Sequence, residues 1–264
     1  CTMSMSLFTA CGDDKKETDN KGSDIKNTYP LNMTALEATA HMGNGINLGN
    51  TMEATNNRLG FTANPEQYEL AWGQPITIKP YFDAYKEAGF DSVRIPVAWT
   101  NTMDWRNGDF EINKDYLERV ATVVQYALDA DLYVIINDHW DYGWWGLFGH
   151  DQKTAYKIFD AIWDTVGTYF KDYSPRLVFE AGNEEWGDRF NDKVDGKPGK
   201  LGIGAQYKLI TTLAQRFVDK IRAQGGNNTD RFLLIPGYST DIDKTVSPNY
   251  VMPEDKTNKI QKLL

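Results

Sequence analysis

Short apolar runs alternate along this chain with amphipathic stretches, and this alternation is the feature that most restricts its fold. The apolar runs span five or six residues, are rich in β-branched and aromatic side chains, and lack strict polar alternation. That pattern predicts strands covered on both faces, whereas apolar residues at every third or fourth position predict helices. Strands are predicted at 45–49, 92–97, 133–138, 177–181 and 232–236, and helices at 76–88, 114–129, 153–171 and 205–223.

The repeated order of strand and helix indicates a parallel α/β domain. A doubly wound sheet usually carries a GxGxxG phosphate turn directly after its first strand. Residues 43–50, GNGINLGN, lack that motif, and no helix pattern follows at once. We therefore predict a (β/α)8 TIM barrel. Because a closed barrel needs eight strands and the sequence predicts five, the barrel is expected to be truncated after about five βα units, in a domain that spans 31–264.

Charge and composition exclude several classes of function. The net charge is −9, whereas nucleic-acid binding needs a basic face. The only cysteines, Cys1 and Cys11, precede the predicted domain, and the chain has three histidines, at 41, 139 and 150. We therefore expect neither a disulfide nor a zinc cluster in the domain, no metal and no organic cofactor. We also expect a monomer.

The first 30 residues look like the end of a bacterial lipoprotein signal followed by a tether. The segment LFTAC, which ends at Cys11, resembles a lipobox, although Phe8 stands where leucine is usual. The polar stretch 12–27 suits a flexible tether. We expect a lipid on Cys11 as the only membrane contact, and a location in the bacterial cell envelope, facing outward or toward the periplasm. The alternative is a disordered tail with an incidental cysteine.

Polar and aromatic residues follow each predicted strand, at the edge where the active sites of such barrels lie. Seven of the eight tryptophans fall in these loops, and only Trp163 lies in a predicted helix. Indole faces stack on the apolar faces of sugar rings, while carboxylates and amides bind hydroxyl groups, so we predict a carbohydrate cleft. The alternative is that the tryptophans pack the loops onto the barrel. The residues expected to bind substrate are Asn50, Glu53, Trp72, Trp99, Trp140, Trp144, Trp186 and Tyr238.

A charged residue, Arg94, lies inside the apolar run 92–97. A buried guanidinium stays charged and therefore needs a partner, and a carboxylate at the barrel mouth is the natural one. We expect Glu180 to point into the barrel interior as such a partner. A purely structural ion pair is the alternative.

Four segments, GINLGNTMEA, SVRIPVAW, VIINDHWD and VFEAGNEEW, together resemble glycoside hydrolase family 5, the cellulase-like group of retaining β-glycanases. The resemblance covers about residues 40–240. It is closest to the endoglucanase and xyloglucanase branch, whose first loop also carries AWG, here at 71–73. It implies a retaining endo-β-1,4-glycanase that hydrolyses β-glucan-type polysaccharide on a (β/α)8 barrel. It does not distinguish cellulose, mixed-linkage glucan, xyloglucan and mannan.

The resemblance also implies roles for four residues. Glu184 would be the general acid/base, and Asn183 would hold the sugar 2-hydroxyl. Arg94 would lie beneath the nucleophile, and His139 would line the subsite next to the cleaved bond. Retaining hydrolysis needs a second carboxylate as nucleophile, which in this family follows the seventh strand. We therefore expect the nucleophile beyond residue 264, and little or no turnover from these residues alone.

Two departures from the family pattern leave an alternative open. Glu185 stands where the family has proline, and Trp140 where many relatives have a second histidine. The alternative is a non-catalytic, glycan-binding surface lipoprotein on the same barrel. Glu185 is also the reserve candidate for the acid/base. Because strand alternation would place Asn183 and Glu184 on opposite sides, the strand is expected to twist or bulge at its end.

Overall fold

The computed structural model describes residues 33–263 of this chain. Cys11, its lipobox and the predicted tether lie outside the described residues, so their role stays a prediction. None of the helices in the described part of the chain is both long and apolar enough to cross a membrane.

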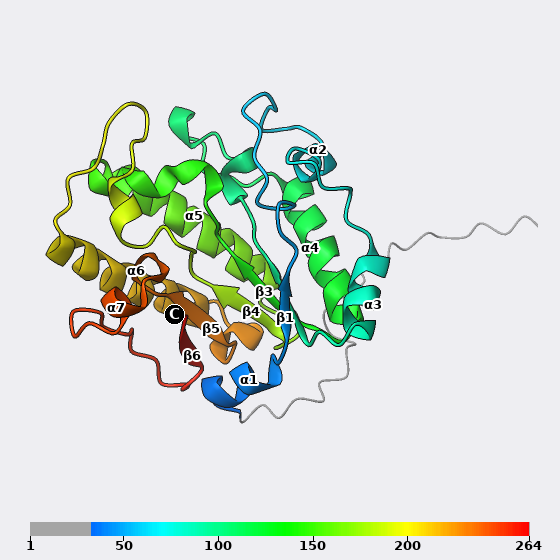
Figure 1. Cartoon of the computed structure of the whole chain (residues 1–264). Coiled ribbons are helices and arrows are strands. Elements are labelled where there is room, and N and C mark those ends of the chain that lie inside the picture. The colour runs from blue at the N-terminus through cyan, green and yellow to red at the C-terminus, as the bar shows by residue number, and fades with distance from the viewer. Residues whose placement is uncertain (1–32, 264) are drawn as a thin grey trace, which may run out of the picture.

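One parallel sheet contains six strands in chain order, so each strand pairs with the next one along the sequence. This arrangement confirms the predicted barrel-type α/β class, and Figure 1 shows α4, α5 and α6 around the outside of the curved sheet. The strands are β1 (Gly45–Asn47), β2 (Ser92–Ile95), β3 (Tyr133–Asn137), β4 (Leu177–Glu180), β5 (Leu233–Pro236) and β6 (Ile260–Leu263).

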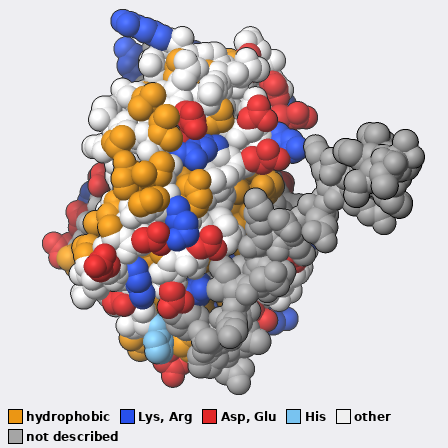
Figure 2. Space-filling model, turned by 90° about the vertical axis from the view of Figure 1, so that its right-hand side faces the viewer, with side chains coloured by type: hydrophobic (Ala, Val, Ile, Leu, Met, Phe, Trp, Pro, Cys, Tyr) orange, Lys and Arg blue, Asp and Glu red, His pale blue; other side chains and the backbone are white. Residues whose placement is uncertain are grey.

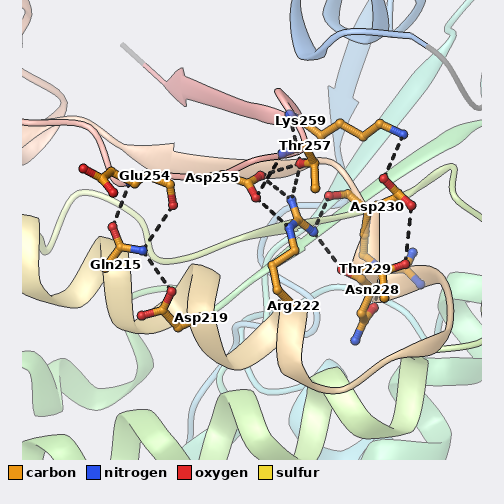
Figure 3. A network of polar contacts seen from close by, with 11 residues as sticks. Gln215, Asp219, Arg222, Asn228, Thr229, Asp230, Glu254, Asp255, Thr257 and Lys259 are labelled. Atoms are coloured by element: carbon orange, nitrogen blue, oxygen red, sulfur yellow. Dashed lines mark hydrogen bonds and ion pairs between the residues drawn. The ribbon is translucent and has the colours of Figure 1, made fainter.

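All five predicted strands form, and a sixth strand that the sequence did not predict, β6, pairs in parallel with β5 along four positions. A polar segment precedes β6, and its docking is visible only in the folded chain (Figure 3). Arg222 forms an ion pair with Asp255 (2.8 Å), and Gln215 binds the backbone N–H (2.8 Å) and carbonyl (3.1 Å) of Glu254. These contacts with α6 hold the polar segment in place, next to β6 at the edge of the sheet.

The predicted helices form close to their predicted positions. The helices are α1 (Ala35–His41), α2 (Pro65–Glu69), α3 (Lys79–Glu87), α4 (Lys114–Asp129), α5 (Gln152–Phe170), α6 (Ile203–Ala223) and α7 (Ile242–Thr245). Side chains cap several of them: Asn113 accepts a hydrogen bond from the N–H of Asp115, and Asp151 accepts one from that of Thr154. The helix α3 begins three residues later than predicted, because Pro80 occupies its first turn and Ile78 is extended.

The helix α1 covers the amino-terminal end of the sheet (Figure 1). Its Ala35 and Ala38 pack with residues from the starts of several strands in a cluster of buried side chains that is separate from the main core. The backbone N–H of Ala35 also donates to the carbonyl of Asn258, just before β6. The main core lies between the sheet and the helices around it. The opposite end of the sheet is therefore left to the loops that follow the strands.

Figure 2 shows the face that lies on the right of Figure 1. Acidic and basic side chains are interspersed there among apolar ones, so the visible part of this face carries no continuous basic field.

Candidate active site

An ion pair joins β2 to β4 at the carboxyl ends of the strands. The guanidinium of Arg94 donates from Nε to Glu180 Oε2 (2.6 Å) and from Nη2 to Oε1 (2.9 Å). The Glu180 side chain is fully buried and that of Arg94 is 19% exposed, so both charges are largely removed from water. The carboxylate partner expected for Arg94 is confirmed, and the two-pronged geometry fixes the orientation of both side chains.

The same guanidinium positions the residue before the proposed acid/base. Its Nη2 donates to Asn183 Oδ1 (2.9 Å), so the Asn183 amide nitrogen points away from Arg94. The Asn183 side chain also contacts the carboxyl group of Glu185, whose side chain is buried. One chain of polar contacts thus runs from Glu180 through Arg94 and Asn183 to Glu185.

The strand β4 ends at Glu180, before the motif that follows it. Residues 183–186 form a turn, and within it Glu184 is exposed, Asn183 is half-buried and Glu185 is buried. The expected twist or bulge is therefore replaced by an earlier end of the strand. The turn escapes strand alternation, and this is what lets Glu184 reach solvent while Asn183 stays on Arg94.

Gly182 is required where this turn begins. A Cβ atom at this position would lie 2.3 Å from Nε1 of Trp186, which is closer than side chains can approach. The indole of Trp186 folds back under the turn and is fully buried. Glycine thus permits the close approach that exposes Glu184.

Burial raises the pKa of Glu185 to about 7, and the nearby charge of Glu184 contributes in the same direction. Glu185 is therefore a mixture of protonated and ionised forms at neutral pH. Its Oε2 atom has no hydrogen-bond partner among the described groups. As a buried side chain beneath the turn, Glu185 is poorly placed to serve as the reserve acid/base.

His139 follows β3 and is held by its backbone and by its ring. Its N–H donates to the carbonyl of Val97 (2.9 Å), and its ring Nδ1 lies 3.3 Å from the amide nitrogen of Asn137. Because that amide nitrogen is a donor, Nδ1 accepts and Nε2 carries the proton. Burial, with the charge of Arg94, lowers the pKa of His139 to about 4. The imidazole is therefore neutral at ordinary pH and can donate a hydrogen bond from Nε2.

Two of the predicted tryptophans are exposed to solvent: Trp72 is 41% exposed and Trp140 is 38% exposed. Trp72 is fixed by a hydrogen bond from its Nε1 to the carbonyl of Thr55 (3.1 Å). Trp140 lies 6.2 Å from the ring of Tyr142, whose hydroxyl accepts from the N–H of Asn56 (2.9 Å). Residue 55 thus holds the indole of Trp72 directly, and residue 56 holds the tyrosine whose ring lies beside Trp140.

The prediction that the other aromatic residues face the cleft was wrong. Their side chains have no measurable exposure, and they pack the loops onto the barrel. Because these loops have no sheet or helix face of their own, large rings supply the apolar contact area that orders them. The buried residues are Trp99, Trp144, Trp186 and Tyr238. The Nε1 of Trp99 donates to the carbonyl of Asn137 (2.9 Å), and the ring of Trp144 stacks on that of Trp145 with 4.2 Å between the ring centroids. The hydroxyl of Tyr238 contacts Asp188 and Gln206.

In the loop after β1, one of the two residues predicted to bind substrate has a different role. The carboxylate of Glu53 accepts from the N–H groups of Asn50 (2.5 Å) and Thr51 (2.8 Å), and the side chain is buried. The predicted role of Glu53 in binding sugar hydroxyls is therefore corrected to that of a brace for its own loop. Asn50 itself has φ of 60° and is exposed, so its side chain remains available at the mouth.

A feature that sequence reasoning missed is a turn of three residues with positive φ after Trp140. Asp141, Tyr142 and Gly143 have φ of 45°, 60° and 68°. The two residues before the glycine rarely adopt this conformation, so the surroundings must hold them in it. The Asp-Tyr-Gly sequence offered a weak signal, since aspartate tolerates positive φ and glycine favours it.

The sequence model of the family described as "Cellulase (glycosyl hydrolase family 5)" matches residues 52–262. The chain belongs to glycoside hydrolase family 5. This family 5 chain is 36% identical over 230 residues to endoglucanase A of Paenibacillus barcinonensis, covering 84% of the chain and 53% of the relative. It is 35% identical to a xyloglucan-specific endo-β-1,4-glucanase of Bacteroides ovatus, covering 87% of the chain and 44% of the relative.

Solved structures of family 5 enzymes resemble this chain to a similar degree. A broad-specificity endoglucanase from Ruminococcus champanellensis with bound cellotriose has a TM-score of 0.75 at 32% identity, covering 88% of this chain and 65% of that one. A Prevotella bryantii family 5 enzyme in complex with a xyloglucan tetradecasaccharide has a TM-score of 0.76 at 32% identity, with coverages of 89% and 66%. This family 5 chain spans about half the length of the curated relatives it matches.

The part of this family 5 chain that the structure describes contains no obvious set of metal ligands. Within residues 33–263, no group of three or more His, Cys, Asp or Glu side chains is arranged to hold a metal ion. The described site therefore offers carboxylates, an amide, a neutral imidazole and two exposed indoles, which are groups suited to proton transfer and sugar binding.

Proposed function

We propose that the protein is a retaining endo-β-1,4-glycanase that hydrolyses β-glucan-type polysaccharide. The observation that carries the proposal is the linkage of Arg94 to both Glu180 and Asn183, which presents Glu184 at the carboxyl end of the sheet in a family 5 chain. Glu184 is exposed, as a group that must reach a polymeric substrate has to be.

In this proposal Glu184 protonates the leaving oxygen and then removes a proton from the water that completes the reaction. Asn183, fixed through its Oδ1, turns its amide nitrogen away from Arg94 to bind the sugar 2-hydroxyl. Neutral His139 donates from Nε2 to a hydroxyl of the same sugar. Retaining hydrolysis also needs a second carboxylate, which attacks the anomeric carbon.

The exposed indoles of Trp72 and Trp140 are proposed to stack on neighbouring sugar units, with Asn50 binding a hydroxyl at the mouth. Similarity to relatives named for endoglucanase and xyloglucan-specific activity supports a β-1,4-glucan backbone as the substrate. A panel of cellulose, mixed-linkage glucan, xyloglucan and mannan, tested on the full-length gene product, would separate the substrates.

The decisive experiment uses Glu184→Gln in the full-length protein. Loss of a general acid/base is expected to lower kcat by about 10²–10⁴-fold while leaving the Kd for a cello-oligosaccharide within a few-fold of wild type. The loss should be much smaller for an aryl glycoside whose leaving group needs no protonation. Glu87→Gln, an exposed glutamate at the end of α3, is the matched control and should have no effect. A Glu184→Gln enzyme with the full rate on polysaccharide would refute the assignment.

The second candidate, a non-catalytic glycan-binding lipoprotein, draws on the exposed Trp140 and the buried Glu185 beside Glu184. It predicts tight glycan binding and no release of reducing ends by the full-length wild-type protein. Hydrolysis that depends on Glu184 would exclude it.

We also propose that the protein is a monomer held at the bacterial cell envelope by a lipid on Cys11. The lipobox-like sequence and the polar stretch after it support this. The full-length protein should partition into a detergent phase, and Cys11→Ser should move it to the aqueous phase. Equal partition of both forms would exclude the anchor.

A further inference from the structure

Two carboxyl groups that the proposed hydrolysis does not use lie on either side of His139 and Trp140. Asp138 and Asp141 are both fully buried, and their side chains are in hydrogen-bonding contact with each other. Asp141 accepts from the N–H (2.9 Å) and the hydroxyl (2.5 Å) of Thr100. Its oxygens are thus supplied with donors from the loop after β2.

The oxygens of Asp138, in contrast, have no protein donor. Neither Oδ1 nor Oδ2 finds one among the described groups, and the indole N–H of Trp144 lies beside both carboxyl groups outside the geometry of a regular hydrogen bond. Two ionised carboxylates cannot remain in contact in a buried site. A proton on Asp138, donated to Asp141, removes one charge and gives both groups a partner.

The other titratable groups that face the pair add no positive charge. Glu185 faces Asp138 from the turn after β4, while the phenols of Tyr116 on α4 and Tyr142 face Asp141. Arg94, the cation of the site, is bound to Glu180 and Asn183. A shared proton would neutralise the pair without any of these groups.

The pair of Asp138 and Asp141 is tied to the backbone that carries His139 and Trp140. Asp141 begins the turn with positive φ at 141–143, and its bonds to Thr100 hold that turn against the loop after β2. At the other end of the same turn, the hydroxyl of Tyr142 is held by Asn56. His139 and Trp140 lie between Asp138 and Asp141, so a rigid pair fixes both of them.

We propose that Asp138 and Asp141 share one proton, and that Asp138 is thereby a positioning residue for His139 and Trp140. In the protonated state, Asp138 donates to Asp141 and locks the turn. When the last proton leaves, two negative charges repel each other and the turn loosens. The claim about the sugar-facing side chains rests on the proposed function, whereas the shared proton does not.

The direction of the pH dependence follows from burial. Burial raises the pKa of Asp138 well above its ordinary value and that of Asp141 to about 6. Groups whose pKa is raised by folding stabilise the fold fully below the pKa of the unfolded chain, about 3.9 for Asp, and lose that contribution as pH rises through the folded value. Since the pair titrates as a unit, its last proton leaves well above the ordinary pKa of an aspartate.

The test compares Asp138→Asn with Asp138→Leu in the full-length protein. The amide of Asn can donate to Asp141 but cannot ionise. We therefore expect the wild-type Tm at pH 7, and a Tm that falls less than that of wild type as the pH is raised further. Leu removes the donor, so we expect a lower Tm at every pH and a KM for cello-oligosaccharides raised about tenfold with a smaller change in kcat. Asp243→Asn, an exposed position on α7, should match wild type.

Infrared difference spectra supply a second readout at pH 7. The spectra are taken in a Glu185→Gln background, because Glu185 is itself a buried carboxyl group that is partly protonated at this pH. In that background the protein should show the carbonyl stretch of a buried protonated carboxyl group, and adding Asp138→Asn should remove it. The proposal is overturned if Asn loses stability with pH in parallel with wild type, or is as damaging as Leu at pH 7, or leaves the infrared band in place. If the wild-type protein shows no hydrolysis, the proposed function fails, while the Tm and infrared results still decide the shared proton.

Discussion

The two ends of the sheet bury polar groups in opposite ways. At the amino-terminal end, the fully buried Arg231 donates to the backbone carbonyls of Ser174 (3.0 Å), Leu177 (2.6 Å) and Phe170 (2.9 Å), among others, and to Asn228 Oδ1 (2.7 Å). At the carboxyl-terminal end, buried atoms of Asp138, Glu185, Trp144 and Trp186 lack regular partners among the described groups, and residues 141–143 have positive φ.

This contrast distinguishes the end of the sheet that stabilises the fold from the end that carries the candidate active site. Guanidinium donors that all meet fixed carbonyls tie the start of β5 to the segment between α5 and β4 without needing a carboxylate. Imperfectly paired groups and unusual backbone conformations persist only where the rest of the fold enforces them, and they gather at functional sites. The amino-terminal end is therefore the stable base on which the other end holds its less favourable geometry.

The largest expected effects come from replacing the buried arginine at each end. Arg231→Met leaves several carbonyls without donors, so the free energy of unfolding should fall by more than about 3 kcal/mol. Arg94→Met leaves Glu180 as an unpaired buried charge, so a loss of about 3–5 kcal/mol is expected. Chemical unfolding at neutral pH measures both.

Activity per folded molecule then distinguishes the two ends. It should survive in Arg231→Met and be lost in Arg94→Met, because only Arg94 orients Asn183 beside Glu184. Equal loss of specific activity in the two variants would contradict the division between the ends.

A pH effect of intermediate size is expected at Glu185. Burial raises its pKa to about 7, so its protonated form favours the fold, and this contribution is lost as pH rises from the ordinary value of 4.5 through about 7. The loss amounts to at most about 3 kcal/mol at 1.36 kcal/mol per pKa unit. Glu185→Gln should abolish the part of the decline in Tm that falls between about pH 5 and pH 8. A decline of the same size in the variant would show that Glu185 does not titrate there.

The smallest effect tests the close approach at Gly182. A methyl group there meets the indole nitrogen of Trp186, so Gly182→Ala should cost about 1–3 kcal/mol and lower kcat by displacing Glu184. Gly204, inside α6, has nothing within 4 Å of an added Cβ, so Gly204→Ala should stabilise by up to about 1 kcal/mol. A Gly182→Ala variant with unchanged stability and rate would show that the turn tolerates displacement.

Much of the fold could be predicted because it depends on local patterns. Apolar periodicity located α4, α5 and α6 within two residues at either end, and continuous apolar runs located the first five strands. The strand β6 was missed because its sequence is half polar, and the segment before it is held by Arg222 and Gln215 of α6, which are distant in the sequence. A strand whose stability comes from such distant contacts leaves little trace in its own residues.

The candidate site was predictable only in part, for a related reason. The position of Arg94 in an apolar strand implied a carboxylate partner, and the structure supplies Glu180. The tryptophans that follow the strands all looked alike in sequence, yet Trp72 and Trp140 are exposed while Trp99 and Trp186 are buried. Indole serves equally well as a packing side chain and as a sugar platform, so residue type cannot distinguish the two uses.

The sequence by itself determined the order of the first five strands and the main helices between them, the resemblance to the family, and which residues stand where those strands end. Only the tertiary structure decided what those residues do: Glu184 reaches solvent, Glu185 is buried beside it, and Asp138 meets Asp141. The reason is physical. Period and composition act between neighbours along the chain, whereas exposure and ionisation depend on groups that folding brings together from distant strands.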